Sequence, residues 1–370
     1  MPWVYVIQPG RHSPGLLSAR RENHVKRLEI LFGCQILLLV AIAGAHGASY
    51  QIRELGVFAE GSAGLPCVGW ANGINSSGRI VGVVYDSGVS YAAASNDQGD
   101  LVLLEEGLLL GVNGLGQAAG CAGSAAVWDA AGNVTHLFLP SGASFSQARA
   151  INDSGQAVGE CWMGTTDVHN YALLWSAAGD PTSICEGSGN SINSSGSVAG
   201  STNDSGGARR AFLWTTSGGI AQLAGGLSSE ANALNNYGLV AGAVTDAAGT
   251  WACQWDASGS LTLLDNLPGS MSSVAYGINN SGVIVGSCDT PQGTFAVLWQ
   301  PDGSITSLGE PTGHASSAAY ALNDFGQIVG CSVDASTSPH PVVWELVPEP
   351  ASVLALLVGL VGLLPRLRRR

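Results

Sequence analysis

The chain has 370 residues, of which 52 are Gly and only 11% are charged. This composition favours a turn-rich protein over a mainly helical one. Residues 49–365 contain five Arg, no Lys and 25 Asp or Glu, which gives this part a net charge of −20. Such a surface repels phosphate backbones. We therefore expect no nucleic-acid partner, and cations or neutral polymers remain as candidates.

Residues 1–48 have the pattern of a leader followed by a signal peptide. Four basic residues between positions 20 and 27 precede an apolar run from Ile30 to Ala45, and small residues follow up to Ala48. A basic region, an apolar segment and a small-residue exit are typical of a secretory signal that is removed from the mature protein. A permanent membrane anchor is the alternative.

A nine-residue motif, best seen in 278–286, recurs through the rest of the chain. It consists of an apolar residue, Asn, two small or polar residues, Gly, a spacer, two mostly apolar residues and a second Gly. The seven Asn are Asn75, Asn113, Asn152, Asn193, Asn235, Asn279 and Asn323. The first Gly stands three residues after the Asn and the second Gly four residues later, and successive copies start 38 to 44 residues apart. Self-similarity at this spacing predicts an array of supersecondary units.

The best-formed copy, 273–310, predicts four short strands. An apolar run (274–278) and a β-branched run (283–288) flank the turn residues Asn280-Ser281-Gly282, which predicts a hairpin with Gly in the left-handed conformation. Two more strands are expected at 294–299 and 304–308, separated by Pro301-Asp302-Gly303. Four hairpin-connected strands per unit indicate a propeller blade.

The third predicted strand of most copies ends in Trp. These residues are Trp128, Trp175, Trp214, Trp255, Trp299 and Trp344, and Ser95 takes the place in the first copy. Their bulk suits the wedge-shaped space between neighbouring blades, so we expect packing rather than chemistry.

The seventh copy stops after its third strand, at 344–346, and the missing strand is found at the other end of the chain. Residues 50–56 match 303–309 in pattern. An N-terminal strand that completes the last blade would close the ring and remove two open sheet edges. The sequence thus predicts an all-β, closed seven-bladed β-propeller, with an open β-solenoid as the alternative.

The loops between second and third strands differ in length between copies, most of all in the second and third copies. The longest of these loops contains Trp162, Asp167, His169 and Tyr171. Loops on a rigid scaffold commonly carry binding residues, and aromatic side chains with carboxylates suit a sugar chain. This is the candidate ligand loop, and an ordinary surface loop is the alternative.

We find no pattern of catalytic or metal-binding residues. His136, His169, His314 and His340 are scattered without metal-ligand spacing, and Asp153 and Asp324 stand inside the Asn-x-x-Gly turns. We therefore predict no enzyme, no cofactor and no metal site. Seven Cys follow the leader, and those after the second Gly of a copy are expected to pack rather than to form disulfides.

The C-terminal segment, 347–370, combines three features in order. Pro348-Glu349-Pro350 precedes an apolar run from Ala351 to Leu364, and four Arg follow: Arg366, Arg368, Arg369 and Arg370. The run would form a transmembrane helix of roughly 21 Å, which is short for a lasting span. This pattern predicts a sorting signal held briefly in the membrane.

Two resemblances follow from these motifs. The Pro-Glu-Pro motif, apolar segment and arginine cluster resemble the PEP-CTERM signal of Gram-negative surface proteins. That resemblance implies processing near 348–350 by an exosortase-type membrane protease and delivery to an extracellular polymer matrix. The repeats, with 211–214 after the motif, resemble the HAF repeats of extracellular proteins over nearly all of 50–346. Neither family supplies a catalytic residue.

We therefore interpret the chain as a leader and signal peptide (1–48), a propeller of HAF-like repeats (49–346) and a PEP-CTERM signal (347–370). The expected role is non-catalytic: binding or structural support in the exopolysaccharide layer at the cell surface or in the matrix. A propeller hydrolase or lyase acting on that polysaccharide is the alternative. A ligand-sensing ectodomain with a permanent anchor is a third interpretation.

Overall fold

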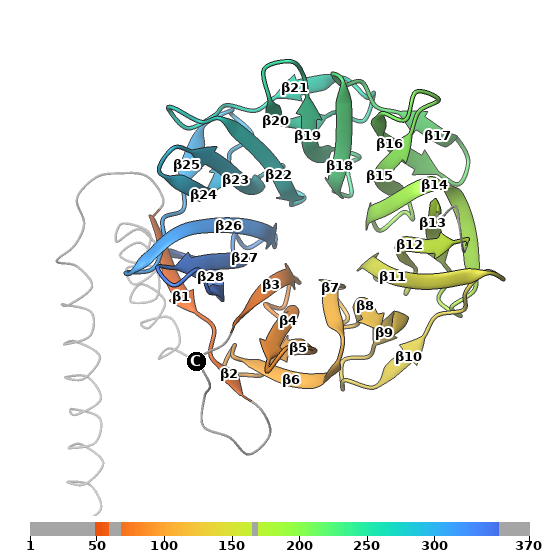
Figure 1. Cartoon of the computed structure of the whole chain (residues 1–370), viewed down its shortest axis with the longest axis horizontal. Coiled ribbons are helices and arrows are strands. Elements are labelled where there is room, and N and C mark those ends of the chain that lie inside the picture. Colours follow the sequence, from red (N-terminus) through yellow and green to blue (C-terminus); the bar gives the residue numbers. More distant parts are fainter. Residues whose placement is uncertain (1–48, 59–67, 165–168, 348–370) are drawn as a thin grey trace, which may run out of the picture. The chain divides into compact units, whose positions relative to one another are not determined.

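Antiparallel strands surround a central axis in the way predicted for a β-propeller (Figure 1). The computed structural model describes residues 49–58, 68–164 and 169–347, and within these ranges the regular structure is β-strand. Residues Tyr50–Leu346 form one compact unit.

The strands make six hydrogen-bonded sheets. The first sheet contains β2 (Val57–Phe58), β3 (Val68–Ile74), β4 (Ile80–Asp86), β5 (Val89–Ser95) and β6 (Leu101–Glu106). The second contains β7 (Leu108–Val112), β8 (Ala118–Ala122), β9 (Ser124–Trp128) and β10 (Val134–His136). The third contains β11 (Ala143–Ile151), β12 (Ala157–Met163), β13 (His169–Trp175), β14 (Pro181–Ile192), β15 (Val198–Asn203), β16 (Arg209–Thr215) and β17 (Gly219–Gln222).

The remaining sheets have four strands each. The fourth contains β18 (Ser228–Leu234), β19 (Val240–Thr245), β20 (Thr250–Trp255) and β21 (Leu261–Leu263). The fifth contains β22 (Ser272–Ile278), β23 (Ile284–Thr290), β24 (Gly293–Trp299) and β25 (Ile305–Ser307). The sixth contains β26 (His314–Leu322), β27 (Ile328–Asp334), β28 (Pro339–Val347) and β1 (Ser49–Glu54).

The prediction of seven separate four-stranded blades is corrected by this topology. The third and fourth repeats share one seven-stranded sheet, because the 12-residue strand β14 takes part in both. Its first half pairs with β13 and its second half, from Gly187, pairs with β15. The first sheet also gains a fifth strand, β2, which pairs with β6 in parallel.

The two glycines of each repeat are required for different structural reasons. The first Gly lies at positive φ, between 75° and 82° in all seven copies, as the turn chemistry predicts. The second Gly lies opposite a β-bulge in the preceding strand. At Gly286, for example, an added Cβ would overlap the carbonyl oxygen of Val274, and the bulge lies between Ala275 and Gly277. The bulge bends the inner strand so closely over its neighbour that only Gly fits there.

The repeated Trp residues pack between neighbouring repeats, as predicted. Trp128, Trp175, Trp255, Trp299 and Trp344 are fully buried. Most of their indole N–H groups donate to a carbonyl that follows the previous repeat's last strand, as Trp175 does to Phe138 at 2.8 Å. Trp214 is only partly buried. In the first repeat, the Ser95 hydroxyl instead accepts the N–H of Ile80 at 2.9 Å.

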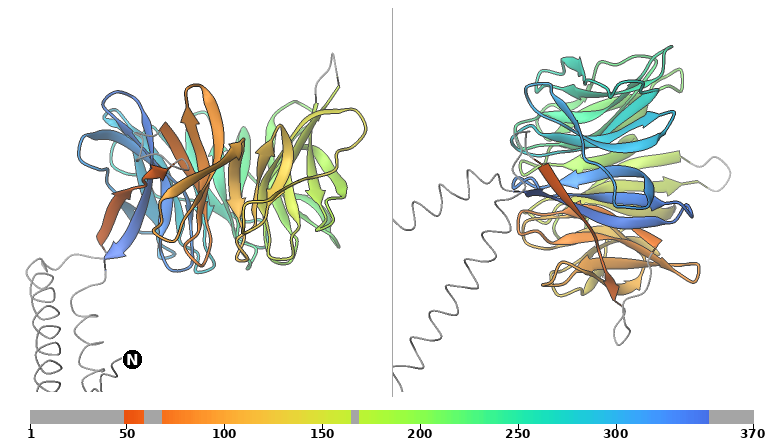
Figure 2. Two further views of the ribbon diagram at one scale, coloured as in Figure 1. Left: turned by 90° about the horizontal axis from the view of Figure 1, so that it is seen from below. Right: turned by 90° about the vertical axis from the view of Figure 1, so that its left-hand side faces the viewer.

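The N-terminal strand joins the two ends of the ring. β1 pairs with β28, as predicted, and the chain then crosses to the first sheet as β2 (Figures 1 and 2). Leu55 donates its N–H to the Pro341 carbonyl at 2.9 Å, and Leu101 donates to the Gly56 carbonyl at 2.8 Å. Consecutive residues therefore hydrogen-bond to the last repeat and to the first.

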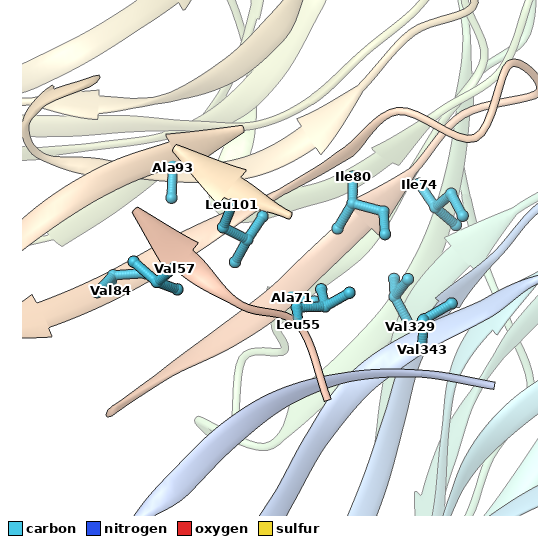
Figure 3. Packing of buried hydrophobic residues seen from close by; sticks show 10 residues of the cluster. All are labelled: Leu55, Val57, Ala71, Ile74, Ile80, Val84, Ala93, Leu101, Val329 and Val343. Atoms are coloured by element: carbon cyan, nitrogen blue, oxygen red, sulfur yellow. The ribbon is translucent and has the colours of Figure 1, made fainter. Parts of the chain in front are cut away.

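Apolar side chains seal this junction. Leu55 and Val57 are buried in a cluster with residues of the first repeat and with Val329 and Val343 of the last (Figure 3). Closure thus combines strand pairing with a small core drawn from segments nearly 300 residues apart.

Several predictions concern residues outside the described ranges. The signal peptide, the apolar C-terminal helix and the sorting residues at 348–350 and 366–370 all lie there. Within the described residues, no helix is long and apolar enough to cross a membrane. The six cysteines in these ranges are free thiols, five of them buried in strands, which agrees with a packing role.

Candidate functional site

Seven asparagine side chains form a closed ring around the axis on one face of the propeller. Each opens a turn, and its amide Nδ2 donates to the backbone carbonyl of the corresponding Asn in the next repeat. The series runs from Asn75 to Asn113 at 2.8 Å, continues through Asn152, Asn193, Asn235 and Asn279, and returns from Asn323 to Asn75 at 3.0 Å. We call this side of the molecule the turn face.

The same amide groups also hold the turns. In the first copy, Oδ1 of Asn75 accepts the N–H groups of Ser77 and Arg79 at 3.0 and 2.9 Å. Each Asn therefore shapes its own turn with its oxygen and contacts the next repeat with its nitrogen. The oxygen and the nitrogen of each buried side-chain amide both have hydrogen-bond partners. The ring of Asn residues therefore holds the neighbouring turn residues rigidly.

An axial opening of about 290 Å³ lies within this ring. Its lining comprises the turn Asn residues, the apolar residues before them and the residues that follow them. These following residues vary between copies: Ser76, Gly114, Asp153, Ser194, Asn236, Asn280 and Asp324. The Asn residues are the same in all seven repeats, whereas the residues after them differ. These variable residues determine the chemistry at the mouth of the opening.

Four of these variable positions form a continuous hydrogen-bonded arc. Ser194 donates its backbone N–H to Oδ1 of Asn236 at 2.9 Å, and Asn236 donates its backbone N–H to Oδ1 of Asn280 at 3.0 Å. Asn280 donates its N–H and its Nδ2 to the two carboxylate oxygens of Asp324, both at 2.8 Å. This arc presents amide and carboxylate groups in fixed orientations.

In three of the turns, the second residue after the Asn has a large apolar or aromatic side chain. Tyr237 and Phe325 are 73% and 71% exposed, and Leu115 is similarly exposed. The backbone N–H groups of Tyr237 and Phe325 are held by Oδ1 of Asn235 and Asn323. Each of these two rings therefore stands on an ordered turn, directly after Asn236 or Asp324 of the polar arc.

Two carboxylates line the mouth, as turn residues of the third and seventh repeats. Oδ1 of Asp153 accepts the N–H of Gly114 at 2.6 Å, and Asp324 accepts the two bonds from Asn280. These bonds account for the two Asp residues as turn formers, as their place inside the Asn-x-x-Gly turns indicates. Their charge also makes the mouth unfavourable for an anionic ligand.

The predicted ligand loop lies at the other end of the strands. β12 begins after the Asn152 turn and ends at Met163, so Trp162, His169 and Tyr171 lie toward the face opposite the turns. Trp162 is stacked on Phe145 with ring centroids 4.6 Å apart, and Nδ1 of His169 lies 2.7 Å from Glu186. Asp167 lies outside the described residues. The loop therefore remains a candidate, separate from the axial opening.

One cluster has the composition of a hydrolytic triad but not its accessibility. Nδ1 of His314 lies 2.8 Å from the Ser332 hydroxyl, and Nε2 lies 3.2 Å from the Glu54 carboxylate. Ser332 is 0% exposed, and its hydroxyl bonds the Ser316 carbonyl. The cluster attaches β1 to the last sheet and presents no nucleophile to a substrate. Among the described residues, no group of three or more His, Cys, Asp or Glu could hold a metal ion.

Sequence reasoning missed the axial site although its signal was present. The repeat motif identifies the seven Asn residues, but the motif alone indicates only a turn-forming role for the residues that follow them. A closed ring brings equivalent positions of all repeats to one axis, so the residues after each Asn had to meet there. The variation at these positions, from Gly to Asp, was the available signal.

Comparisons with known proteins support the fold. No family model matches the chain, and no curated protein matches its sequence. Among solved structures, it is similar to virginiamycin B lyase from Staphylococcus aureus, with a TM-score of 0.51 and 10% identity over 81% of this chain and 100% of that one. It is also similar to acylaminoacyl peptidase from Pyrococcus horikoshii, with a TM-score of 0.55 and 11% identity over 79% of this chain and 54% of that one.

A third similar structure is the β-propeller domain of the Trilobed protease from Pyrococcus furiosus, which has an open velcro topology. The TM-score is 0.54 and the identity is 9%, over 75% of this chain and 95% of that domain. Identities this low identify a β-propeller and nothing finer. The activities of these proteins therefore say nothing about the chemistry of this chain.

Proposed function

We propose that the chain is a non-catalytic binding propeller that contacts neutral polysaccharide through its turn face. The supporting observations are the axial mouth, lined by the arc of Ser194, Asn236, Asn280 and Asp324, and the exposed rings of Tyr237 and Phe325, which follow Asn236 and Asp324 in their turns. Ring faces pack against the apolar faces of sugars, and amide and carboxylate groups bond their hydroxyls. The net charge of −20 over 49–365 disfavours an anionic polymer.

The binding experiment compares insoluble polymers under the same conditions. We expect the mature protein to be retained on curdlan, a neutral glucan, or on cellulose, and to pass through alginate beads at low salt. The double variant Tyr237→Ala and Phe325→Ala should lose retention by tenfold or more. Leu227→Ala removes an exposed apolar side chain next to Thr245, at the end of β19 opposite the turns, and should be retained normally. Equal retention of the double variant, or no retention of the unaltered protein on either neutral polymer, would refute the proposal.

We propose that the protein acts outside the cell, at the surface or in the matrix, after sorting by an exosortase-type membrane protease. This proposal rests on the signal peptide and the Pro348-Glu349-Pro350 motif in the sequence. Intact mass of the protein from the producing cell should lack both 1–48 and the residues after the motif. Glu349→Ala should leave the precursor in the membrane fraction. Unchanged release of this variant contradicts the sorting proposal, and a retained tail favours the ligand-sensing alternative.

The alternative function is a hydrolase or lyase that acts on the same polysaccharide. The observation in its favour is that Asp153 and Asp324, from different repeats, line one opening. Glycoside hydrolysis requires two carboxyl groups facing one bond. Release of reducing ends or unsaturated sugars, abolished by Asp153→Asn and by Asp324→Asn, would establish it. Binding without such products supports the non-catalytic function.

A further inference from the structure

A second cavity, of about 570 Å³, lies on the face opposite the turns, where the first repeat meets the last. Val68 and Trp70 of β3 and Tyr85 of β4 form one wall, and the other wall comes mainly from β26, β27 and the turn before β28. This volume is in the range of small-ligand sites. The cavity depends on ring closure, because its walls come from the two ends of the propeller.

The lining of this cavity is neutral although the chain is strongly acidic. None of its twelve residues carries a charge. Three are aromatic, and five carry aliphatic hydroxyl groups or a thiol: Thr294, Ser316, Ser317, Thr337 and Cys331. Aromatic rings and hydroxyls together suit a ligand with apolar faces and hydroxyl edges. A sugar has both.

The aromatic side chains are held in a fixed arrangement. Trp70 packs edge-to-face against Tyr85 with ring centroids 5.4 Å apart, and Tyr85 is 41% exposed. In the other wall, the ring of Tyr320 packs edge-to-face against Tyr276 with ring centroids 5.6 Å apart. Burial raises the pKa of Tyr320, so its hydroxyl stays protonated and can hydrogen-bond.

Thr337 provides an independent sign of function. It lies at the cavity in a left-handed conformation, with φ of 68°, although β-branched residues disfavour this region. The equivalent turn after β15 has the same hydrogen bonds and carries Gly207 there, with φ of 80°. A glycine would thus fit the turn at Thr337 without strain. Strained residues are found at binding sites where the side chain has a role.

We propose that this junction cavity binds a neutral sugar residue, as a second site distinct from the turn face. Tyr85 would supply an exposed ring for stacking, and the Thr337 hydroxyl would bond the sugar. This inference goes beyond the proposed function, because a propeller with sites on both faces could link two polymer strands. Each site can fail without the other.

The test uses the mature protein and soluble neutral oligosaccharides built from glucose, galactose, mannose and N-acetylglucosamine, with affinity measured by calorimetry. We expect at least one to bind with a Kd of about 1 mM or tighter. Tyr85→Ala should weaken binding at least tenfold. Thr337→Gly should weaken binding similarly while raising the melting temperature by roughly 2–4 °C, since it relieves strain. Phe138→Ala should change neither.

The outcomes separate the two sites. If Tyr85→Ala and Thr337→Gly leave affinity unchanged, or if no neutral oligosaccharide binds, the junction site is refuted. Loss of oligosaccharide binding only in the Tyr237→Ala and Phe325→Ala double variant would place the sugar on the turn face and also refute it. Failure of polymer retention with intact oligosaccharide binding at the junction would instead refute the turn-face proposal. A Thr337→Gly protein that is less stable than the unaltered one would contradict the strain argument.

Discussion

The side-chain amide of Asn323 donates a hydrogen bond to the backbone carbonyl of Asn75, 248 positions earlier in the chain, at 3.0 Å. This bond closes the ring of seven equivalent bonds on the turn face. The same Asn323 accepts the N–H groups of Phe325 and Gln327, both at 3.1 Å. One buried side chain therefore supports a turn and joins the last repeat to the first.

Replacement of Asn323 by Ala should destabilise the protein by about 2–4 kcal/mol. The Asn75 carbonyl keeps its bond from Gly78, and the two turn N–H groups that lose their acceptor are only partly buried. The expected loss is therefore below the sum of about 1–3 kcal/mol for each fully buried unsatisfied group. Urea denaturation measures the loss. Ser336→Ala, in an exposed turn of the same sheet, is the control and should cost less than about 1 kcal/mol.

Asn323→Asp separates the two roles of this side chain. A carboxylate can still accept the turn N–H groups, but it faces the Asn75 carbonyl without a proton to donate. The folded state should therefore raise the pKa of the new carboxyl, and a raised pKa means that stability is lost as pH rises through it. We expect the variant to be closer to the unaltered protein at pH 4 than at pH 7. The opposite trend would show that the Nδ2 bond contributes little.

The repeat was predictable because its residues are fixed by local chemistry. Asn279 and Gly282 identify the turn, and the structure confirms the hairpin and the positive φ of Gly282. The shared strand β14 was not predictable, since it depends on how two neighbouring repeats join. The cavity between Trp70 and Tyr320 depends on ring closure, and nothing local to either residue indicates that both line one cavity.

The two glycines of a repeat should respond differently to alanine. Gly282→Ala places a side chain at φ of 82°, in ordinary van der Waals contact with Pro301 and Leu239, which costs about 1–2 kcal/mol. Gly286→Ala would overlap the Val274 backbone carbonyl, so the bulged pair must move, and we expect a loss of about 3 kcal/mol or more. Thermal unfolding of the two variants measures the order. Equal losses would show that the second glycine is not required by close strand approach.

Leu55 should control the closure of the ring as well as the stability of its core. Leu55→Ala removes a buried side chain from the junction cluster and should cost about 2–5 kcal/mol. Leu173→Ala creates a comparable cavity far from the junction and should cost a similar amount. Hydrogen exchange distinguishes them, because only Leu55→Ala should speed exchange in 49–58. Equal exchange in both variants would mean that β1 is held by its strand pairing alone.

Glu160 should make stability depend on pH through its partner Arg149. The Glu160 side chain is 5% exposed and lies 2.7 Å from the Arg149 guanidinium. Burial alone would raise its pKa, but the Arg149 charge and the hydrogen bonds from Arg149, Asn170 and Gln147 lower it overall. A carboxyl with a lowered folded-state pKa contributes stability above its unfolded pKa, and this contribution is lost as pH falls through the folded value.

Arg149→Met leaves the Glu160 carboxylate buried without its cation. Breaking a fully buried pair costs about 3–5 kcal/mol, and partial exposure of Arg149 reduces this to about 2–3 kcal/mol at pH 7. The deficit should shrink as pH falls toward 4, because the unpaired Glu160 becomes protonated. Arg53→Met, which breaks a more exposed pair with Asp100, should cost less than about 1 kcal/mol. A deficit for Arg149→Met that is constant between pH 4 and 7 would indicate lost packing rather than a lost charge pair.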